Sequence, residues 1–204
     1  TADGDLVGAA YVFFGSDQRE GTADISSADL IFEGVAQASM TGYSVASVGD
    51  VNGDSIDDVA VVAQRGAAAS PSGTIYVFFG GSNLSGTVPV SDADITIEGR
   101  VAGGGGGIAV AENVDVDGDG QSDVVIGQPE ASPVGPASGS VYVFYGTSLG
   151  SGPVDIEDAD VTLQGRVIGQ QFGRSVVPVD FDGDGHDEIA IGAPGDPQYG
   201  RQAG

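Results

Sequence analysis

Residues 172–194 read FGRSVVPVDFDGDGHDEIAIGAP, and motifs within and around this stretch recur along the chain. Its Asp180-Phe-Asp-Gly-Asp is echoed by Asp115-Val-Asp-Gly-Asp and Asp50-Val-Asn-Gly-Asp, at a spacing of 65 residues in both steps. Tyr76-Val-Phe-Phe-Gly and Ala93-Asp-Ile-Thr-Ile-Glu-Gly also each have two counterparts, which begin at Tyr11, Tyr142, Ala28 and Ala159. Because three independent motifs follow nearly one period, the chain is built of structural repeats.

Each period contains four short runs rich in β-branched and aromatic residues, bounded by Gly, Pro, Ser or Asp. In the middle of the chain these runs are 108–114, 124–127, 140–145 and 160–163. No segment has helical periodicity or helix caps. Four short strands per repeat predict an all-β fold of the β-propeller class, with one four-stranded blade per repeat. The alternative is a tandem array of β-sandwiches, although a sandwich typically needs about 100 residues.

The Tyr-Val-Phe-Phe runs indicate where the core lies. Side chains alternate between the two faces of a strand, so Tyr76 and Phe78 share one face and Val77 and Phe79 share the other. Both faces are therefore apolar, as expected of a strand enclosed between neighbouring sheets. We expect these residues to form packed core and not a ligand platform.

Phe172-Gly173, the Asp180 motif and Gly192-Ala193-Pro194 together resemble the FG-GAP repeat, which forms the blades of the integrin α-subunit propeller. The other two copies depart from this pattern. Their Phe-Gly positions hold Thr41-Gly42 and Gly106-Gly107, and their Gly-Ala-Pro positions hold 62–64 and 127–129. The resemblance covers essentially the whole chain. It implies a propeller with calcium bound in a hairpin loop on one rim of each blade.

The strand order divides one domain, 1–204, into unequal parts. Residues 1–34 supply the third and fourth strands of a blade, 35–99 and 100–165 are blades, and 166–204 supply a first and second strand. About three blade-equivalents cannot enclose a channel, because propellers close with roughly 4–8 blades. We therefore expect a homodimer in which complementary half blades complete a six-bladed ring. The alternative is a fragment of a longer propeller.

Three nine-residue windows, 50–58, 115–123 and 180–188, hold 13 of the 30 acidic residues. Oxygen-bearing side chains occupy positions 1, 3, 5 and 9 of every window, and glycine occupies position 4. Alternate hard oxygen ligands suit Ca²⁺, which takes 6–8 oxygens. Position 7 varies, so a ligand there must be its backbone carbonyl. The expected ligands of about three Ca²⁺ ions per chain are Asp50, Asn52, Asp54, Ile56, Asp58, Asp115, Asp117, Asp119, Gln121, Asp123, Asp180, Asp182, Asp184, His186 and Glu188.

Two alternatives bear on these windows. Asp and Gly are favoured in turns that bind no metal, but three copies that keep the same four positions favour a metal site. An EF-hand would need a bidentate Glu at position 12. That position holds Val61, Ile126 or Ile191, each within an apolar run.

Charge and composition limit the classes of function that the chain can have. Six Arg and no Lys against 30 acids give a net charge of −24, which repels nucleic acid and anionic membranes. There is no Cys, and no apolar run reaches the ~18 residues of a membrane span.

The single histidine, His186, is expected to be an exposed loop residue, and no catalytic constellation stands out. We expect a non-enzymatic, extracellular or cell-surface module for adhesion, protein interaction or structural support. The alternatives are a lectin-like propeller with a glycan ligand and a non-catalytic propeller from a larger secreted enzyme.

Overall fold

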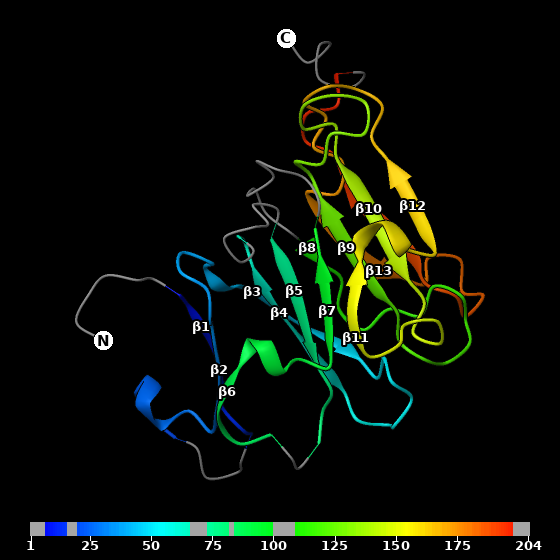
Figure 1. Cartoon of the computed structure of the whole chain (residues 1–204). Coiled ribbons are helices and arrows are strands. Elements are labelled where there is room, and N and C mark those ends of the chain that lie inside the picture. Colours follow the sequence, from blue (N-terminus) through cyan, green and yellow to red (C-terminus); the bar gives the residue numbers. More distant parts are fainter. Residues whose placement is uncertain (1–6, 16–19, 66–72, 82–83, 100–108, 198–204) are drawn as a thin grey trace.

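The structure is a computed structural model that describes residues 7–15, 20–65, 73–81, 84–99 and 109–197 (Figure 1). These residues form β-strands and three short 3₁₀ helices, and they contain no α-helix. The all-β prediction is therefore confirmed. The strands are β1 (Ala9–Val12), β2 (Leu30–Glu33), β3 (Thr41–Gly49), β4 (Asp58–Ala63), β5 (Thr74–Phe78), β6 (Gly86–Pro89), β7 (Ile95–Glu98), β8 (Ala109–Val110), β9 (Val124–Gln128), β10 (Ser140–Phe144), β11 (Gly152–Asp155), β12 (Val161–Gln164), β13 (Ser175–Val179) and β14 (Glu188–Gly192), and the helices are η1 (Ile25–Ser27), η2 (Val90–Asp92) and η3 (Ile156–Asp158).

Two repeats form four-stranded antiparallel meanders, as a propeller blade does. One has the order β3-β4-β5-β7 and the next has the order β8-β9-β10-β12. The register agrees between them, since Val61 of β4 faces Tyr76 of β5 and Ile126 of β9 faces Tyr142 of β10. The remaining strands form the pairs β1–β2 and β13–β14. The sheets follow one another across the molecule in chain order (Figure 1).

Two strands were missed by the sequence analysis. β6 and β11 lie in the segments between the third and fourth strands of their own repeats. Each pairs in parallel with the outer strand of the preceding repeat, β6 with β2 and β11 with β7. These crossing strands tie neighbouring repeats together by backbone hydrogen bonds.

The core consists of side chains packed between successive sheets. Ile75 and Val77 of β5 contact a cluster that contains Val124, Ile126 and Phe144 of the following repeat. On the other face, Phe78 packs with Ala10, Leu30 and Phe32 of the preceding repeat. Its ring stacks on Phe32, with ring centroids 4.1 Å apart. The prediction that both faces of this strand are core is confirmed.

The first strand of the 100–165 repeat differs from its predicted span of 108–114. β8 covers Ala109–Val110 only, and Ile108 lies outside the described residues. Beyond β8, the Ala111 N–H still donates to the carbonyl of Val125, whereas Asn113, with a φ of 46°, donates to the carbonyl of Ser47 in the preceding repeat. A single bridge, Val114 with Asp123, then leads into the acidic loop.

Candidate metal centres in the hairpin loops

The three acidic windows lie at equivalent places in the fold. Residues 50–58 join β3 to β4, 115–123 lead from β8 to β9, and 180–188 join β13 to β14. The carboxylate at position 1 organises the turn. Asp50 accepts hydrogen bonds from the N–H groups of Gly53, Asp54 and Ser55 at 2.7, 2.9 and 2.7 Å. Asp115 accepts from the same three positions, and Asp180 accepts from Gly183 at 2.7 Å.

The turn requires left-handed backbone at position 4. Gly53, Gly118 and Gly183 have φ values of 78°, 73° and 81° there. A side chain at this position would strain the backbone. The glycine that the three windows share is thus explained by the tight turn that brings the side chains of positions 1 and 3 to one side of the loop.

Two of the loops bring three carboxylates together. The carboxyl oxygens of Asp115, Asp117 and Asp123 lie within 4.8 Å of one another, and those of Asp180, Asp182 and Glu188 do the same. Ligands on opposite sides of a Ca²⁺ ion lie about 5 Å apart, since each stands 2.3–2.6 Å from the ion. The oxygen donors and their spacing therefore fit Ca²⁺. The first loop has the same turn, with the Asn52 amide oxygen at position 3 accepting from the Asp54 N–H at 2.8 Å.

Position 5 is placed differently. Asp119 and Asp184 are not in these groups of three. Their Oδ1 atoms accept from the N–H of Gln121 at 2.8 Å and of His186 at 2.9 Å, and Asp54 accepts from Ile56 in the same way. This bond fixes the backbone at position 7, whose carbonyl is the expected ligand.

Position 9 connects the loop to the rest of its sheet. Asp58 is buried and accepts from Val51 N–H at 3.0 Å and from Gly80 N–H at 2.8 Å, beyond the end of β5. Asp123 repeats this with Val116 at 2.7 Å and Gly146 at 3.0 Å. Burial raises the pKa of both carboxyls above the ordinary value, and these backbone N–H groups oppose the rise. A bound cation would offset the cost of burying these two charges.

The third loop differs at this position. Glu188 is exposed, and its Oε2 accepts from Phe181 N–H at 2.7 Å. The residue that corresponds to Gly80 and Gly146 is Gly15, which lies at the other end of the chain after β1.

The side chains at position 7 make contacts that sequence reasoning missed. Gln121 Nε2 donates to the carbonyl of Val51 in the preceding loop at 2.7 Å. The His186 ring is exposed, as expected, but it lies against Gly118 of the preceding loop, where a Cβ would overlap it. The variability of this position gave no signal of these contacts, since Gln and His reach the neighbouring loop in different ways.

Backbone hydrogen bonds place the three loops in a row. Ser122 N–H donates to the carbonyl of Asp50 at 2.9 Å, and Asp187 N–H donates to the carbonyl of Asp115 at 2.8 Å. The Asp187 carboxylate also accepts from Asp115 N–H at 2.9 Å. Position 8 of one loop is thereby tied to position 1 of the loop before it.

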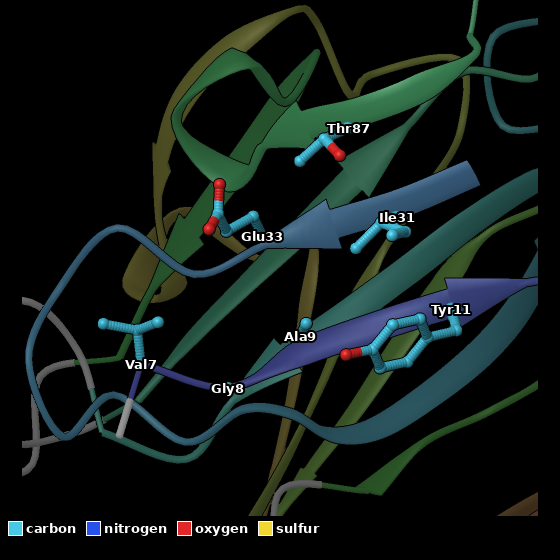
Figure 2. A pocket seen from close by; sticks show the side chains of 7 residues that line it. All are labelled: Val7, Gly8, Ala9, Tyr11, Ile31, Glu33 and Thr87. Carbon is cyan, nitrogen blue, oxygen red and sulfur yellow. The ribbon is translucent and has the colours of Figure 1, made fainter. Parts of the chain in front are cut away.

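A surface pocket lies beside β1 and away from this row (Figure 2). It is lined by Val7, Gly8, Ala9, Tyr11, Ile31, Glu33 and Thr87. The lining contains a single carboxylate, Glu33, and its aromatic residue is Tyr11, which is 43% exposed. The pocket lies over one face of the sheet β1-β2-β6, where Tyr11, Ile31 and Thr87 are neighbours in register.

The sequence profile of the FG-GAP repeat matches residues 41–78, 111–144 and 172–204, which make up more than half of the chain. The chain belongs to the FG-GAP repeat family. Integrin alpha-PS5 of Drosophila melanogaster is 28% identical over 170 residues, which are 81% of this chain and 16% of that protein. The FG-GAP chain is thus an integrin-like β-propeller sequence.

A second group of relatives shares a shorter region. Phosphatidylinositol-glycan-specific phospholipase D is 37% identical in Rattus norvegicus and 38% identical in Homo sapiens, in both cases over 79 residues. These residues are 37% of the FG-GAP chain and 9% of either phospholipase. The chain therefore spans a small part of the curated relatives that it matches. In the described part of the chain, no helix has the length and apolar character needed to cross a membrane.

Proposed function

We propose that this FG-GAP chain is a calcium-stabilised, integrin-like propeller module that acts in adhesion, protein interaction or structural support outside the cell. The observation that carries the calcium part is the pair of matched carboxylate groups, Asp115–Asp117–Asp123 and Asp180–Asp182–Glu188, in equivalent loops. The loop at 50–58 shares their turn and completes a set of about three Ca²⁺ sites. The ligands are the fifteen residues predicted from the sequence.

In this proposal the residues of each loop have separate tasks. The side-chain oxygens at positions 1, 3 and 5 come from the curled turn, and the carboxylate at position 5 also holds the backbone at position 7. The carboxylate at position 9 joins the ion to the start of the second strand. Ca²⁺ would supply positive charge that offsets the repulsion among these carboxylates. Calcium binding therefore favours the folded hairpin over the unfolded chain.

Thermal unfolding with calcium and with a chelator tests the calcium proposal. Ca²⁺ at about 100 times its dissociation constant adds ~2.7 kcal/mol per site. We expect the melting temperature to rise by at least about 5 °C. Asp117→Ala should reduce this rise. The matched control Asp158→Asn alters an exposed acid outside the loops and should leave the rise unchanged. Identical melting curves with calcium and with chelator would contradict calcium binding.

The module is proposed to be non-catalytic. The one histidine of the chain, His186, is exposed in the row of loops, and the sequence places no serine or acid pair to work with it. Two alternatives are retained, a lectin-like propeller and a propeller belonging to a larger enzyme. The second is supported by the match to the phospholipase D proteins. Binding on a glycan array would identify a lectin-like propeller. A hydrolase domain that co-purifies with the chain or is covalently joined to it would identify a propeller of a larger enzyme.

A homodimer through complementary strands is also part of the proposal. In the described residues, β1 has a strand on one side only, and so does β14. Phe13, next to β1, is 38% exposed, whereas its counterparts Phe78 and Phe144 are 0% and 2% exposed. We place β14 of one copy beside β1 of the other, with Ile191 facing Tyr11 as Val61 faces Tyr76.

This pairing also supplies the partner that Glu188 lacks in the third loop. Gly15 N–H would donate to Glu188 across the joint, as Gly80 and Gly146 donate to Asp58 and Asp123. Two such joints related by a two-fold axis give a ring of six blades. Sedimentation or light scattering should give a mass of about twice the 20.2 kDa chain. A mass of one chain at all concentrations would contradict the dimer.

A further inference from the structure

Each repeat contains an equivalent segment between its third and fourth strands, and these segments are Gly21–Asp24, Gly86–Pro89 and Gly152–Asp155. The second and third of them are β6 and β11, which lie along the outer strands β2 and β7 of the preceding sheets. Gly21–Asp24, in contrast, pairs with no strand in the described part of the chain. One of three matched segments thus has the sequence position of a crossing strand without its partner.

The residue that follows each segment shows that the first segment lacks a packing partner. Val90 and Ile156 are both 1% exposed, because they pack into the core clusters between sheets. Their counterpart Ile25 is 60% exposed. Ile25 therefore lacks the contact surface that buries its two counterparts.

The 3₁₀ helix that follows the segment is nevertheless formed as in its counterparts. Ile25 begins η1 as Val90 begins η2 and Ile156 begins η3. The Asp24 carboxylate accepts from Ser26 N–H at 2.9 Å, and Asp155 accepts from Glu157 N–H at 3.0 Å. Because the cap and helix form without a partner, little ordering is needed before the segment docks.

A matching edge lies at the other end of the molecule. The outer strands β2 and β7 are covered by β6 and β11, but β12 is the last strand of its sheet in the described residues. Leu163 of β12 is 36% exposed, whereas its counterparts Phe32 and Ile97 are fully buried. η1 and β12 lie on opposite sides of the intervening sheets (Figure 1), so one chain cannot bring them together.

We infer that residues 21–25 of a second copy of this chain dock on β12 as a parallel strand, with Ile25 packed against Leu163. This inference rests on the proposed homodimer and assigns it a second contact, distinct from the β1–β14 joint. The two observed crossings fix the register, in which Thr22 faces Thr162 as Thr87 faces Ile31 and Pro153 faces Thr96. The Gly21 N–H then donates to the Asp160 carbonyl, as Gly152 donates to Asp94 at 2.7 Å.

The absence of a carboxylate at the end of β12 favours docking of the acidic segment 21–25. The last residue of the outer strand is Glu33 in β2 and Glu98 in β7, but it is Gln164 in β12. The docked Asp24 would face Gln164, so the contact avoids a further pair of like charges in a dimer whose chains each carry −24. By two-fold symmetry each dimer contains this contact twice.

Cross-linking between introduced cysteines tests the register. The chain has no cysteine, so Thr22→Cys with Thr162→Cys adds one defined pair. Facing strand residues lie within the 4.4–6.8 Å Cα range of a disulfide. Mild oxidation of the full chain should give covalent dimers. The control Thr22→Cys with Gln164→Cys is two residues out of register and should give far fewer. Equal yields from the two pairs would overturn the inference.

Dimer dissociation measured by sedimentation tests the energetic role of Ile25. Ile25→Ser should raise the dissociation constant at least about tenfold, since two isoleucine side chains per dimer lose their burial. The control Val35→Ser removes an equally exposed valine, at 56%, which lies outside the contact, and should change nothing.

The outcomes separate this inference from the proposed function. If the wild-type chain is a dimer but Ile25→Ser dissociates no more readily, the docking on β12 is wrong and the β1–β14 joint stands. If the wild-type chain has the mass of one chain at every concentration, both contacts are wrong. The calcium proposal is judged separately, by the melting temperature of the same samples with calcium and with chelator.

Discussion

Gly165 follows β12 at a place where two backbone segments touch. Its N–H donates to the carbonyl of Gly139 at 2.9 Å, and a Cβ built on it would overlap the carbonyl oxygen of Ser138. Gly34 has the same position in the first repeat and the same restriction, against the carbonyl oxygen of Val7. The glycine that ends the Ala-Asp motif is therefore required by close backbone contact and not by a turn.

Gly165→Ala should lower the free energy of unfolding by about 1–3 kcal/mol, because the backbone must shift to admit a methyl group. The control is Gly150→Ala, since a Cβ there would meet no atom within 4 Å. Denaturant unfolding of both variants in excess calcium makes the comparison. An equal effect of the two substitutions would show that the contact at Gly165 is easily relieved.

At this scale the sequence predicted those parts of the candidate site that are local. Positions 1, 3, 5 and 9 follow from side-chain alternation within nine residues, and the position-4 glycine follows from turn geometry. The partners of Asp58 and Gln121 lie in another hairpin or another repeat, at Gly80 and Val51. Contacts over such distances depend on how the sheets pack, which spacing within one loop does not specify.

Two aspartates of the first hairpin loop should contribute differently to the stability of the fold. The buried Asp58 accepts two backbone N–H groups, whereas the exposed Asp54 bonds within the turn. With chelator present, Asp58→Ala should lower stability by about 1–3 kcal/mol, because it leaves buried N–H groups unpaired. Asp54→Ala should cost much less.

Calcium distinguishes the two roles further. Both variants should lose part of the calcium-dependent rise in melting temperature, because both aspartates belong to the first of the proposed sites. Calorimetric melting of Asp58→Ala, Asp54→Ala and wild type, each with calcium and with chelator, measures the two effects. If the two variants melt together in chelator, the hydrogen bonds of Asp58 contribute little to the fold.

Among the elements, antiparallel strands were predictable and crossing strands were not. The runs at 124–127 and 140–145 are continuous apolar segments bounded by turn residues, and they became β9 and β10. β6 and β11 are short, contain Pro, and lie on the edges of sheets to which other repeats contribute. Only their recurrence at one period marks them in the sequence, because Pro within a run argues against a strand.

The whole molecule carries much more negative than positive charge. At −24, mutual repulsion among distant acids opposes the folded state, and it opposes association of two copies even more. Raising monovalent salt from about 0.02 M to about 0.5 M should therefore raise the melting temperature in chelator and strengthen dimerisation. The same screening weakens the attraction for Ca²⁺, so the rise caused by calcium should shrink.

Potassium chloride and choline chloride should act alike, because the effect depends on ionic strength and not on a specific cation. Melting and sedimentation at several concentrations of each salt give the comparison. A rise in stability with potassium alone would indicate cation binding in the loops in place of general screening.

The parallel crossing strands also affect how the chain folds during its translation. β7 leaves the exit tunnel before β11, so the outer edge of its sheet stays uncovered until most of the next repeat has been translated. β2 waits in the same way for β6. The outer strand of each sheet is thus covered only when the crossing strand of the next repeat has been made. Until then, the most recently translated repeat of the nascent chain has an unpaired strand edge.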